Sequence, residues 1–320
     1  MTATDEMRRL LDGRGVEHEP QDNVGGMRYQ PTLDHDMKVE RSIEQMRLAS
    51  RMSERYYSKP LLLCYSGGKD SDTLVELARM SGIRFEVQHS LTTADAPETV
   101  RHVRATFARL EDDGIKCSII HPTYKGKPVS MWSLIPQKLM PPTRIVRYCC
   151  AVLKETGGRG RAICTGVRRA ESNARSGRKF ANNFSRSRHE ALDFEDAADL
   201  FEHADSFAEH DSDFLRSCRM RGSTAFQPIL EWLDDDVWQF LSERRVPTNP
   251  LYAEGFKRIG CIGCPMADRR RRRSDFERWP KYAEAYKRAF SKMLDERKKR
   301  GKETEWADAQ EVFDWWMEAL

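Results

Sequence analysis

Four short apolar runs, separated by segments with helical spacing, constrain the fold of this chain more than any other feature. Runs of this length are typical of buried strands. Strands that alternate with helices of about ten or more residues indicate parallel βαβ units. The sequence therefore predicts an α/β fold with a parallel sheet, whose strands lie at 61–66, 84–90, 115–121 and 161–166.

Helices are expected between these strands and beyond them. The apolar residues at 37–57 recur at a spacing of about 3.6, which predicts an amphipathic helix, and 97–110 is also expected to be helical. A broken helix is expected at 130–140. Three aspartates at the start of 234–245 suit the positive N-terminal end of a helix. The tail at 275–320 is expected to be helical throughout.

Two blocks of opposite charge interrupt this pattern. Residues 168–188 contain seven basic residues and residues 189–213 contain ten acidic ones, and neither block has a strand signal. We interpret about 176–215 as a charged, solvated insertion in which the two blocks partly neutralise each other.

Composition limits the cellular setting. The 320 residues include 54 basic and 50 acidic ones, and this net charge of +4 neither requires nor opposes a nucleic-acid partner. No stretch of about 20 apolar residues is present, and the N-terminal residues lack the apolar core of a secretory signal. A cytoplasmic location without membrane contact is therefore expected. In that reducing compartment, cysteine pairs more often indicate metal or redox chemistry than disulfides.

The segment Ser-Gly-Gly-Lys-Asp-Ser follows the first expected strand and opens onto a helix. Glycines let the backbone turn tightly and bring its N–H groups close to an anion, and the N-terminal end of a helix favours negative charge. The serine hydroxyls and the lysine ammonium add donors. The segment differs from a Walker A loop, which has a longer glycine spacing. The predicted phosphate-binding residues are Ser66, Gly67, Gly68, Lys69, Asp70 and Ser71.

This strand, loop and helix, LLLCYSGGKDSDTLVEL, resembles the PP-loop of the N-type ATP pyrophosphatases and of the phosphoadenosine phosphosulfate (PAPS) reductase family. The resemblance implies an adenine nucleotide α-hydrolase-like, Rossmann-like parallel sheet flanked by helices. It also implies that the loop holds the phosphates of an adenine nucleotide. The expected divisions are an N-terminal arm and helix (1–58), a PP-loop nucleotide-binding α/β domain (59–232) and a helical C-terminal part (233–320).

Two further stretches match the family pattern. The stretch at 89–103 is similar to the region after the second strand, which usually lies near the adenosine. The stretch at 165–175 resembles an element whose arginines face the anionic part of the nucleotide, and arginine forks suit phosphate oxygens. A solvated basic face is the alternative for these arginines. The resemblance thus adds candidate nucleotide contacts at Thr92, Thr93, Asp95, Gly166, Arg168, Arg169 and Arg175.

Four cysteines form two pairs: Cys149 and Cys150 are adjacent, and Cys261 and Cys264 form a Cys-x-x-Cys motif. Four thiolates can hold a [4Fe–4S] cluster or a zinc ion, and a pair can also act in thiol redox chemistry. Adjacent ligands are unusual around structural zinc, which favours spacings of about two to four. The combination resembles the cluster motif of adenylyl-sulfate (APS) reductases, which implies a [4Fe–4S] cluster on these residues. Whether it would carry electrons, tie segments together or handle sulfur stays open.

The remaining cysteines receive different interpretations. Cys64, Cys117 and Cys164 lie in expected strands, where a free cysteine commonly serves as a small buried hydrophobe. Cys218 has arginines on both sides, which favour the thiolate form. It is either a sulfur-handling thiol or an ordinary free cysteine.

The resemblance to the reductases stops at the nucleophile. The reductases attack the sulfate sulfur with a cysteine in a C-terminal Glu-Cys-Gly-type segment, and no cysteine follows Cys264 here. The intact loop instead favours ATP, cleaved between the α- and β-phosphates. The motifs around the cysteines look most like cluster-bearing relatives such as the DNA-phosphorothioation (DndC-like) proteins, which use ATP to activate a substrate for sulfur insertion.

A run of five consecutive arginines follows the Cys-x-x-Cys motif and is a candidate contact for a nucleic-acid backbone. A solvated helix start and contacts with the acidic block are the alternatives. The run comprises Arg269, Arg270, Arg271, Arg272 and Arg273. Five tryptophans could stack on bases, although their helical spacing favours the core; they are Trp232, Trp238, Trp279, Trp315 and Trp316.

Three functional hypotheses follow. The preferred one is an ATP pyrophosphatase that adenylates a substrate for sulfur transfer on a nucleic acid, with Lys69, Asp70 and Arg168 as catalytic residues. Mg²⁺ would neutralise the phosphates, and a protein such as a cysteine desulfurase would donate the sulfur. The second is an APS or PAPS reductase whose nucleophile is Cys218 or comes from a partner. The third is a nucleotide-binding regulatory or assembly subunit with little chemistry of its own.

Overall fold

The structure is a computed structural model of the chain and describes residues 34–155, 157–171, 175, 177–184, 189–192, 195 and 223–318. The residues from His35 onward form one compact unit. No helix in the described ranges is both long and apolar enough to cross a membrane. The N-terminal arm, most of the charged insertion and Cys218 lie outside the described residues. The division expected at 59 and 233 stays a prediction.

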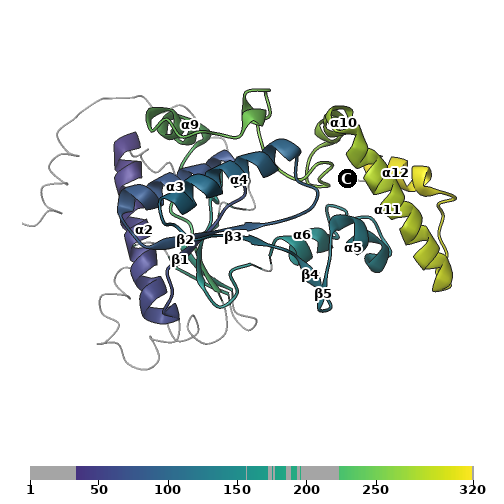
Figure 1. The fold of residues 1–320 in the computed structure, drawn as a ribbon, viewed down its shortest axis with the longest axis horizontal. Coiled ribbons are helices and arrows are strands. Elements are labelled where there is room, and N and C mark those ends of the chain that lie inside the picture. The colour runs from purple at the N-terminus through teal and green to yellow at the C-terminus, as the bar shows by residue number, and fades with distance from the viewer. Residues whose placement is uncertain are drawn as a thin grey trace, which may run out of the picture. The chain divides into compact units, whose positions relative to one another are not determined.

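Within the described ranges, seven strands form one sheet in the order β3-β2-β1-β6-β9-β7-β8. The neighbours from β3 to β9 run parallel, so the predicted parallel sheet is confirmed (Figure 1). Two further strands, β4 and β5, pair only with each other. The bounds are Leu61–Cys64 (β1), Phe85–Ser90 (β2), Cys117–Ile120 (β3), Thr123–Tyr124 (β4), Lys127–Pro128 (β5), Ala162–Cys164 (β6), Ala181–Phe184 (β7), His189–Leu192 (β8) and Ser223–Phe226 (β9).

Helices expected from apolar spacing are present. Helix α4 begins at Pro97, where the missing N–H of proline costs no helical hydrogen bond. The helix expected around 130–140 is α5, which contains Pro136 and ends shortly after it. The bounds are His35–Tyr57 (α2), Lys69–Ser81 (α3), Pro97–Asp112 (α4), Met131–Lys138 (α5), Tyr148–Leu153 (α6), Asp234–Glu243 (α9), Arg269–Arg278 (α10), Pro280–Lys299 (α11) and Ala309–Glu318 (α12), with 3₁₀ turns at Arg169–Glu171 (η1) and Pro250–Tyr252 (η3).

The prediction that the charged blocks contain no strand is wrong. β7 and β8 pair antiparallel with each other, and β7 pairs antiparallel with β9. β9 is also missing from the predicted strands. These strands are four residues long and lie at one side of the sheet, where backbone hydrogen bonds to a neighbour can hold a polar segment without apolar alternation.

The prediction that the tail is helical throughout is wrong in two places. Pro280 separates α10 from α11, because a proline lacks an N–H and disfavours helical backbone at the preceding Trp279, whose ψ is 69°. After α11, Gly301 has a left-handed φ of 61°, and α12 begins only at Ala309. Within the described residues, the tail therefore consists of the end of α10, the whole of α11 and the separate helix α12.

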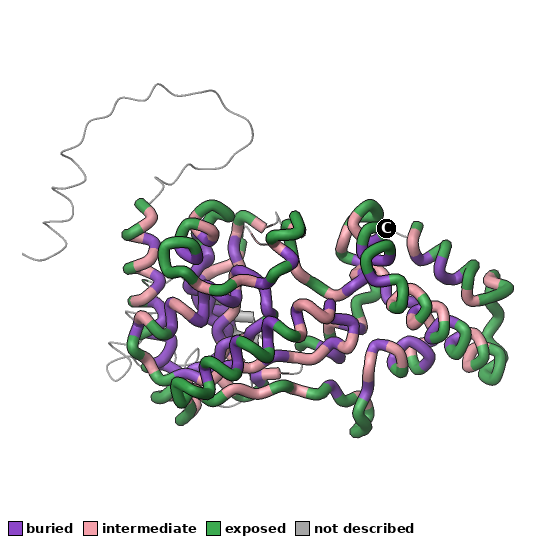
Figure 2. The backbone as a smooth tube through the Cα atoms, turned by 45° about the horizontal axis from the view of Figure 1, so that its top comes forward, coloured by how far each residue is buried: buried purple, intermediate pink, exposed green. Residues whose placement is uncertain are grey.

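Two hydrophobic clusters lie within the described part of the chain, and Figure 2 marks their members among the buried stretches. The first is formed by the sheet with α2, α3, α4 and α9. The second is formed by α5, α6 and the three C-terminal helices, and it contains Cys149, Ile262 and Trp316. The second cluster gives both cysteine pairs an apolar surrounding.

Most, but not all, of the five tryptophans considered for base stacking lie in the hydrophobic core, as their spacing predicts. Trp232, Trp279 and Trp316 are buried, and Trp238 is half-buried. Trp315 is 37% exposed and stacks only on a neighbouring tryptophan ring among the described aromatic contacts.

The strand order reverses between β1 and β6, which lie side by side and parallel. The chain leaves β1 toward α3 and leaves β6 toward η1, so the two loops meet at the same edge of the sheet (Figure 1). Such a switch point is where open α/β sheets bind ligands. The fold thereby places the predicted phosphate loop beside the segment that begins at Gly166.

Trp316 and Trp315 are neighbours in α12 with different burial, which makes them a matched test of the second cluster. We expect Trp316→Ala to lower the free energy of unfolding by about 3–5 kcal/mol, because it leaves a cavity beside Tyr286 and Phe290. Trp315→Ala should cost about 1 kcal/mol or less. Urea denaturation followed by circular dichroism measures both, and equal losses would contradict this packing.

Candidate nucleotide site and cysteine group

The loop between β1 and α3 is fixed by contacts from a segment that follows α9. Gly67 has a left-handed φ of 75°, and a Cβ there would lie 2.9 Å from Val103 Cγ2. The buried Asn249 side chain donates to Gly67 O at 3.0 Å. Tyr252 Oη accepts from Lys69 N at 2.9 Å. The loop therefore has one shape, set before any ligand arrives.

The serines of the loop differ in role. Ser71 Oγ accepts from Gly68 N at 3.2 Å and donates to Gly68 O at 2.7 Å, which closes the first turn of α3. Ser66 is exposed, and its Oγ donates to Ser71 Oγ at 3.3 Å. Ser66 thus offers its hydroxyl to a ligand at the surface, whereas Ser71 holds the turn.

Four charged side chains meet beside this loop; we call them the four-charge network. Lys69 Nζ lies 3.1 Å from Asp234 Oδ1 and 3.3 Å from Asp70 Oδ2. Arg168 Nε lies 2.6 Å from Asp70 Oδ1, and Arg168 Nη2 lies 2.5 Å from Asp234 Oδ1. Both cations are buried, whereas Asp234 is exposed. Partial desolvation opposes ionisation of Asp234. Hydrogen bonds from Arg168 and Lys69 outweigh this effect and lower the pKa of the Asp234 carboxyl.

Gly166 brings the second loop against the first. A Cβ at Gly166 would lie 3.0 Å from the carbonyl carbon, the carbonyl oxygen and the Cβ of Asp70. A side chain there would push the two loops apart. Glycine at this position therefore lets Arg168, two residues later, reach the Asp70 carboxylate.

A second group of cations surrounds Arg175, which pairs with Glu171. Burial lowers the pKa of the Arg175 guanidinium, and the nearby charges of Arg258 and Arg178 lower it further. Arg168 also lies within electrostatic range. The cations thus gather next to the four-charge network and would attract an anion.

Arg169 takes a different position. It pairs with Glu231, and its Nη2 donates to Arg178 O at 2.8 Å. Within the described residues it takes no part in the four-charge network. Its expected contact with the nucleotide stays a prediction.

The segment after β2 leads to the cysteines. Asp95 Oδ2 accepts from Thr92 N at 3.0 Å, and Cys261 Sγ lies 3.5 Å from Thr92 Oγ1. Asp95 and Cys261 form an antiparallel backbone bridge, and Ile262 N donates to Ala94 O at 2.8 Å. This segment and the Cys-x-x-Cys loop are therefore one structural unit.

Thr93 fixes the same segment to α5. Its φ is 64°, and its Oγ1 accepts from Met131 N at 2.8 Å. Thr92 and Asp95 are buried. All three residues thus shape this segment in the structure, and their expected contacts with adenosine stay a prediction.

The two cysteine pairs come together at the second hydrophobic cluster, which Cys149, Cys150 and Cys261 join. A hydrogen bond between Cys149 and Cys150 raises the pKa of Cys149 and lowers that of Cys150. Arg147 Nη2 donates to Cys150 Sγ at 3.6 Å, which also favours the thiolate of Cys150. Cys261 and Cys264 lie within electrostatic range of Cys149.

Among the described residues, no three His, Cys, Asp or Glu side chains are grouped closely enough to hold one metal ion. A Cys₄ zinc site needs four sulfurs at about 2.3 Å from one atom. A [4Fe–4S] cluster makes a weaker demand, because each cysteine binds its own iron.

The expected core cysteines are only partly in the core. Cys164 is buried, whereas Cys64 and Cys117 are half-buried. Cys218 lies outside the described residues.

Behind the loop, a buried polar group links α3 to α4. Tyr65 Oη donates to Asp72 Oδ1 at 2.5 Å, and His102 Nε2 lies 3.0 Å from the same oxygen. Burial raises the pKa of Asp72, and the hydrogen bonds oppose this shift only in part. The group anchors the helix that begins at the phosphate loop.

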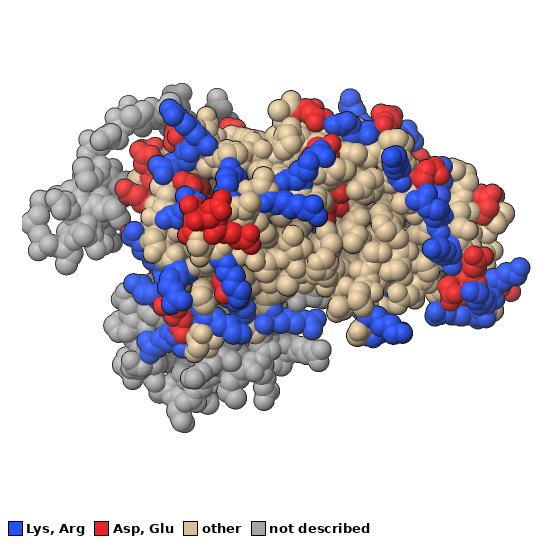
Figure 3. All heavy atoms as spheres, viewed as in Figure 1, with Lys and Arg blue, Asp and Glu red and all other residues tan. Residues whose placement is uncertain are grey.

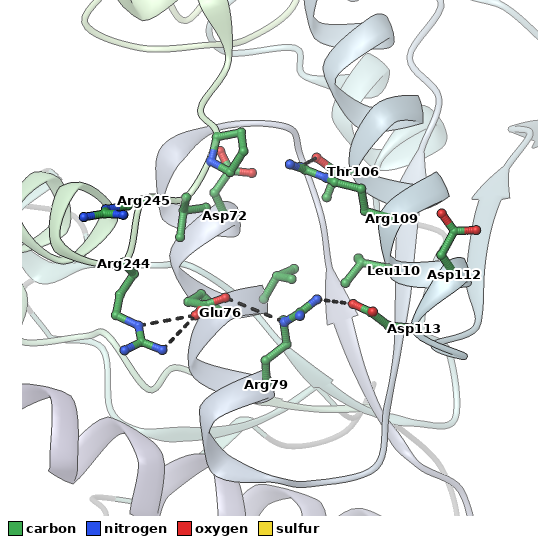
Figure 4. Close-up of a pocket in the computed structure, with 13 residues that line it drawn as sticks. Asp72, Glu76, Arg79, Thr106, Arg109, Leu110, Asp112, Asp113, Arg244 and Arg245 are labelled. Atoms are coloured by element: carbon green, nitrogen blue, oxygen red, sulfur yellow. Dashed lines mark hydrogen bonds and ion pairs between the residues drawn. The ribbon is translucent and has the colours of Figure 1, made fainter.

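A cavity of about 420 Å³ lies beyond this group, between α3, α4 and the segment after α9 (Figure 4). Four of its charged side chains form ion pairs: Arg79 with Asp113, and Arg244 with Glu76 at 3.4 Å. None of the residues predicted to bind nucleotide or metal lines it. We therefore place the candidate site at the switch point and not in this cavity.

The run of arginines begins α10 and divides by burial. Arg269 and Arg273 both pair with Glu318 at 2.9 Å, whereas Arg272 is buried against Trp316. Basic and acidic side chains are interspersed over the face seen in Figure 3. Burial removes Arg272 from the predicted backbone contacts, and the nucleic-acid partner stays a prediction for the exposed arginines.

Comparison with models of known protein families identifies the family of this chain. The family model of the phosphoadenosine phosphosulfate reductase domain matches residues 60–267. The chain belongs to this family. The matched stretch contains the phosphate loop, the switch point and both cysteine pairs, so the resemblance inferred from the loop is confirmed for the family. The DndC-like subtype stays a proposal.

Curated relatives share parts of the chain. An adenosine 5′-phosphosulfate reductase of Burkholderia cepacia is 41% identical over 59 residues, which are 18% of this chain and 24% of that enzyme. An uncharacterised protein of Methanocaldococcus jannaschii is 27% identical over 289 residues, which are 86% of this chain and 58% of that protein. In both cases the chain spans less than two thirds of the relative.

Solved structures match more loosely. The phosphoadenylyl-sulfate reductase of Candida auris, in a phosphate complex, has a TM-score of 0.43 and 16% identity, covering 75% of this chain and 99% of that one. A U34-tRNA thiolase of Methanococcus maripaludis with its [4Fe–4S] cluster has a TM-score of 0.38 and 13% identity, covering 84% and 82%. At these TM-scores neither structure bears on the function of this chain.

Three residues that shape the site carry no functional signal in the sequence. The aspartates at the start of α9 suit a helix N-terminus, and nothing in their spacing points to the contact of Asp234 with Lys69 and Arg168. Asn249 and Tyr252 lie in a turn-rich segment whose prolines indicate a loop only. Their roles depend on contacts with residues far away in the chain.

Gly67→Ala tests the shape of the loop. We expect it to lower the free energy of unfolding by about 1–3 kcal/mol, because alanine is strained at this φ and its Cβ would crowd Val103. Gly177→Ala is the matched control, because a Cβ there meets nothing within 4 Å, and it should change stability by about 0.5 kcal/mol or less. Thermal unfolding of both variants decides, and equal effects would contradict the described loop.

Proposed function

We propose that this protein is an ATP pyrophosphatase that adenylates an acceptor for sulfur transfer. The observation that carries the proposal is the four-charge network beside an intact Ser-Gly-Gly-Lys-Asp-Ser loop. It combines two buried cations with two carboxylates at the switch point of the sheet. A triphosphate with its metal ion presents the complementary charges.

The network favours ATP over a sulfated nucleotide. Phosphate oxygens can take the places of the carboxylates on Lys69 and Arg168, and Mg²⁺ can then take the freed oxygens of Asp70 and Asp234. Every buried charge keeps a partner in this exchange, which matters because an unpaired buried charge is strongly destabilising. A nucleotide without a pyrophosphate brings no such metal ion, so it offers the two carboxylates no cation in exchange for Lys69 and Arg168.

The chain's own residues would then serve adenylation. An oxygen of the acceptor attacks the α-phosphorus, the bond to the bridging oxygen breaks, and pyrophosphate leaves. A Mg²⁺ ion on Asp70 and Asp234 would neutralise the charge of the leaving group. Arg168 and the cations around Arg175 stabilise the charge that builds up on the α-phosphate. Attack of hydrosulfide on the adenylated acceptor forms the bond to sulfur, breaks the bond to the AMP oxygen and expels AMP. Sulfur from a persulfide donor would first take two electrons from a thiol reductant.

We propose that Cys149, Cys150, Cys261 and Cys264 hold a [4Fe–4S] cluster. Support comes from the packing of Cys149, Cys150 and Cys261 in one apolar cluster, with Cys264 within electrostatic range of Cys149. The Arg147 contact that favours the Cys150 thiolate adds to it. When bound, such a cluster would supply one-electron redox chemistry, with each of its iron atoms held by one of the four thiolates.

We propose a nucleic acid as the acceptor, in a reaction like DNA phosphorothioation or tRNA thiolation. The cations around Arg175 and the exposed arginines Arg269 and Arg273 support an anionic partner. The sulfur donor in this proposal is a protein such as a cysteine desulfurase.

Reduction of APS or PAPS is the second candidate, because the chain is 41% identical over 59 residues to an adenosine 5′-phosphosulfate reductase. It requires a nucleophilic thiol from Cys218 or from a partner, and it predicts release of sulfite with a thiol reductant.

Calorimetric titration of Mg·ATP, APS and PAPS into anaerobically prepared protein separates these candidates. We expect Mg·ATP to bind at least tenfold more tightly than either sulfated nucleotide. Lys69→Gln should weaken Mg·ATP binding at least tenfold and abolish pyrophosphate release, because it removes a buried cation from the network. Lys116→Gln, at an exposed lysine, is the matched control. Tighter binding of APS or PAPS would overturn the ATP proposal in favour of the reductase.

Iron and sulfide content tests the cysteine group. We expect about four iron atoms per chain after anaerobic reconstitution, and Cys149→Ser and Cys261→Ser should each lower this content and the visible absorbance. Cys117→Ser, a strand cysteine outside the group, should leave both unchanged. Stoichiometric zinc in place of iron would contradict the cluster.

A further inference from the structure

Arg272 is buried with part of its guanidinium unsatisfied. It is 1% exposed, its Nη1 donates to Trp316 O at 2.9 Å, and its plane lies over the Trp316 ring at 4.2 Å. Its Nε and Nη2 have no hydrogen-bond partner in the described part of the chain. Arginine keeps its charge in proteins, so a buried guanidinium with unused donors is costly unless a bound group satisfies them.

No carboxylate of the described residues forms an ion pair with Arg272. Two acids within electrostatic range of Arg272 pair with other arginines: Asp275 with Arg271 at 2.6 Å, and Glu318 with Arg273 at 2.9 Å. These acids act on Arg272 only from a distance, so its Nε and Nη2 donors stay open to a bound anionic group.

The helix face that carries Arg272 lies against the Cys-x-x-Cys loop. Asp275 and Phe276, three and four residues further along α10, share this face. Asp275 Oδ2 accepts from Gly263 N at 3.1 Å. The Phe276 ring packs against Gly263 so closely that a Cβ on Gly263 would lie 2.4 Å from Phe276 Cζ. Cys264 lies within electrostatic range of the Arg272 guanidinium.

We infer that Arg272 supplies positive charge and N–H donors to the iron–sulfur cluster from the α10 side and raises its reduction potential. This inference rests on the proposed cluster. A [4Fe–4S] cluster with four thiolate ligands is anionic in both oxidation states and more negative when reduced. A fixed cation nearby therefore stabilises the reduced form more, and hydrogen bonds to the sulfurs act in the same direction.

Redox titration of the reconstituted protein tests the inference, with the reduced cluster followed by EPR. We expect Arg272→Gln to lower the ratio of reduced to oxidised cluster about tenfold at a fixed potential, a shift of about 59 mV for a one-electron couple. Arg272→Lys keeps the charge and should recover most of the potential. Arg273→Gln, the exposed neighbour on the same helix, is the matched control and should leave the potential unchanged.

The outcomes separate this inference from the proposed function. If the wild-type protein binds no iron, the cluster fails, and the inference fails with it. If the wild-type protein and a folded Arg272→Gln variant carry equal iron and sulfide at equal potentials, Arg272 has no such role and the cluster stands. An equal shift in Arg273→Gln would also overturn the inference, because it would reflect net charge alone.

A second measurement keeps the test decisive if Arg272→Gln does not fold. In wild-type protein grown with ¹⁵N-guanidino-arginine, pulsed EPR of the reduced cluster should detect coupling to guanidinium nitrogen. The part of this coupling that comes from Arg272 should disappear in Arg272→Lys and persist in Arg273→Gln. Unchanged coupling in Arg272→Lys would overturn the inference.

Discussion

The pairing of two buried cations with two aspartates is the interaction on which the rest of the structure depends. Lys69 belongs to α3, Arg168 follows β6, and Asp234 begins α9. The pairing therefore requires the strand order at the switch point, the close approach at Gly166 and the placement of α9 all at once. An error in any of them would leave a buried charge unpaired, so the same electrostatics that specify the fold also assemble the site.

Much of this arrangement is encoded locally and can be read from the sequence. The parallel strands are short apolar runs. The phosphate loop is recognised by its glycines and by its place between a strand and a helix. Gly166 and Arg168 are identified by family resemblance, and the structure gives both a physical reason, which is contact with Asp70. The two cysteine pairs are apparent from their spacing, and the fold brings them into one apolar surrounding.

What the sequence does not reveal depends on distant partners. The strands β7 and β9 are polar or short and exist because the neighbouring strand offers backbone hydrogen bonds. Asn249 looks like an ordinary turn residue until Gly67 lies beside it. Arg272 is hidden among identical neighbours, although its spacing from Asp275 and Phe276 already puts the three on one helix face. In each case the missing information is which remote surface the residue meets.

The backbone bridge between Asp95 and Cys261, with the hydrogen bond from Ile262 N to Ala94 O, joins the segment after β2 to the Cys-x-x-Cys loop through main-chain atoms. Any residue other than proline at these positions can offer the same atoms. Substitutions can therefore change the side chains of both segments without breaking the backbone bridge. Insertions and deletions cannot, because they shift which residues face each other. The lengths of these two segments are consequently under tighter constraint than the identities of their residues. Insertions and deletions among relatives should therefore lie outside both segments.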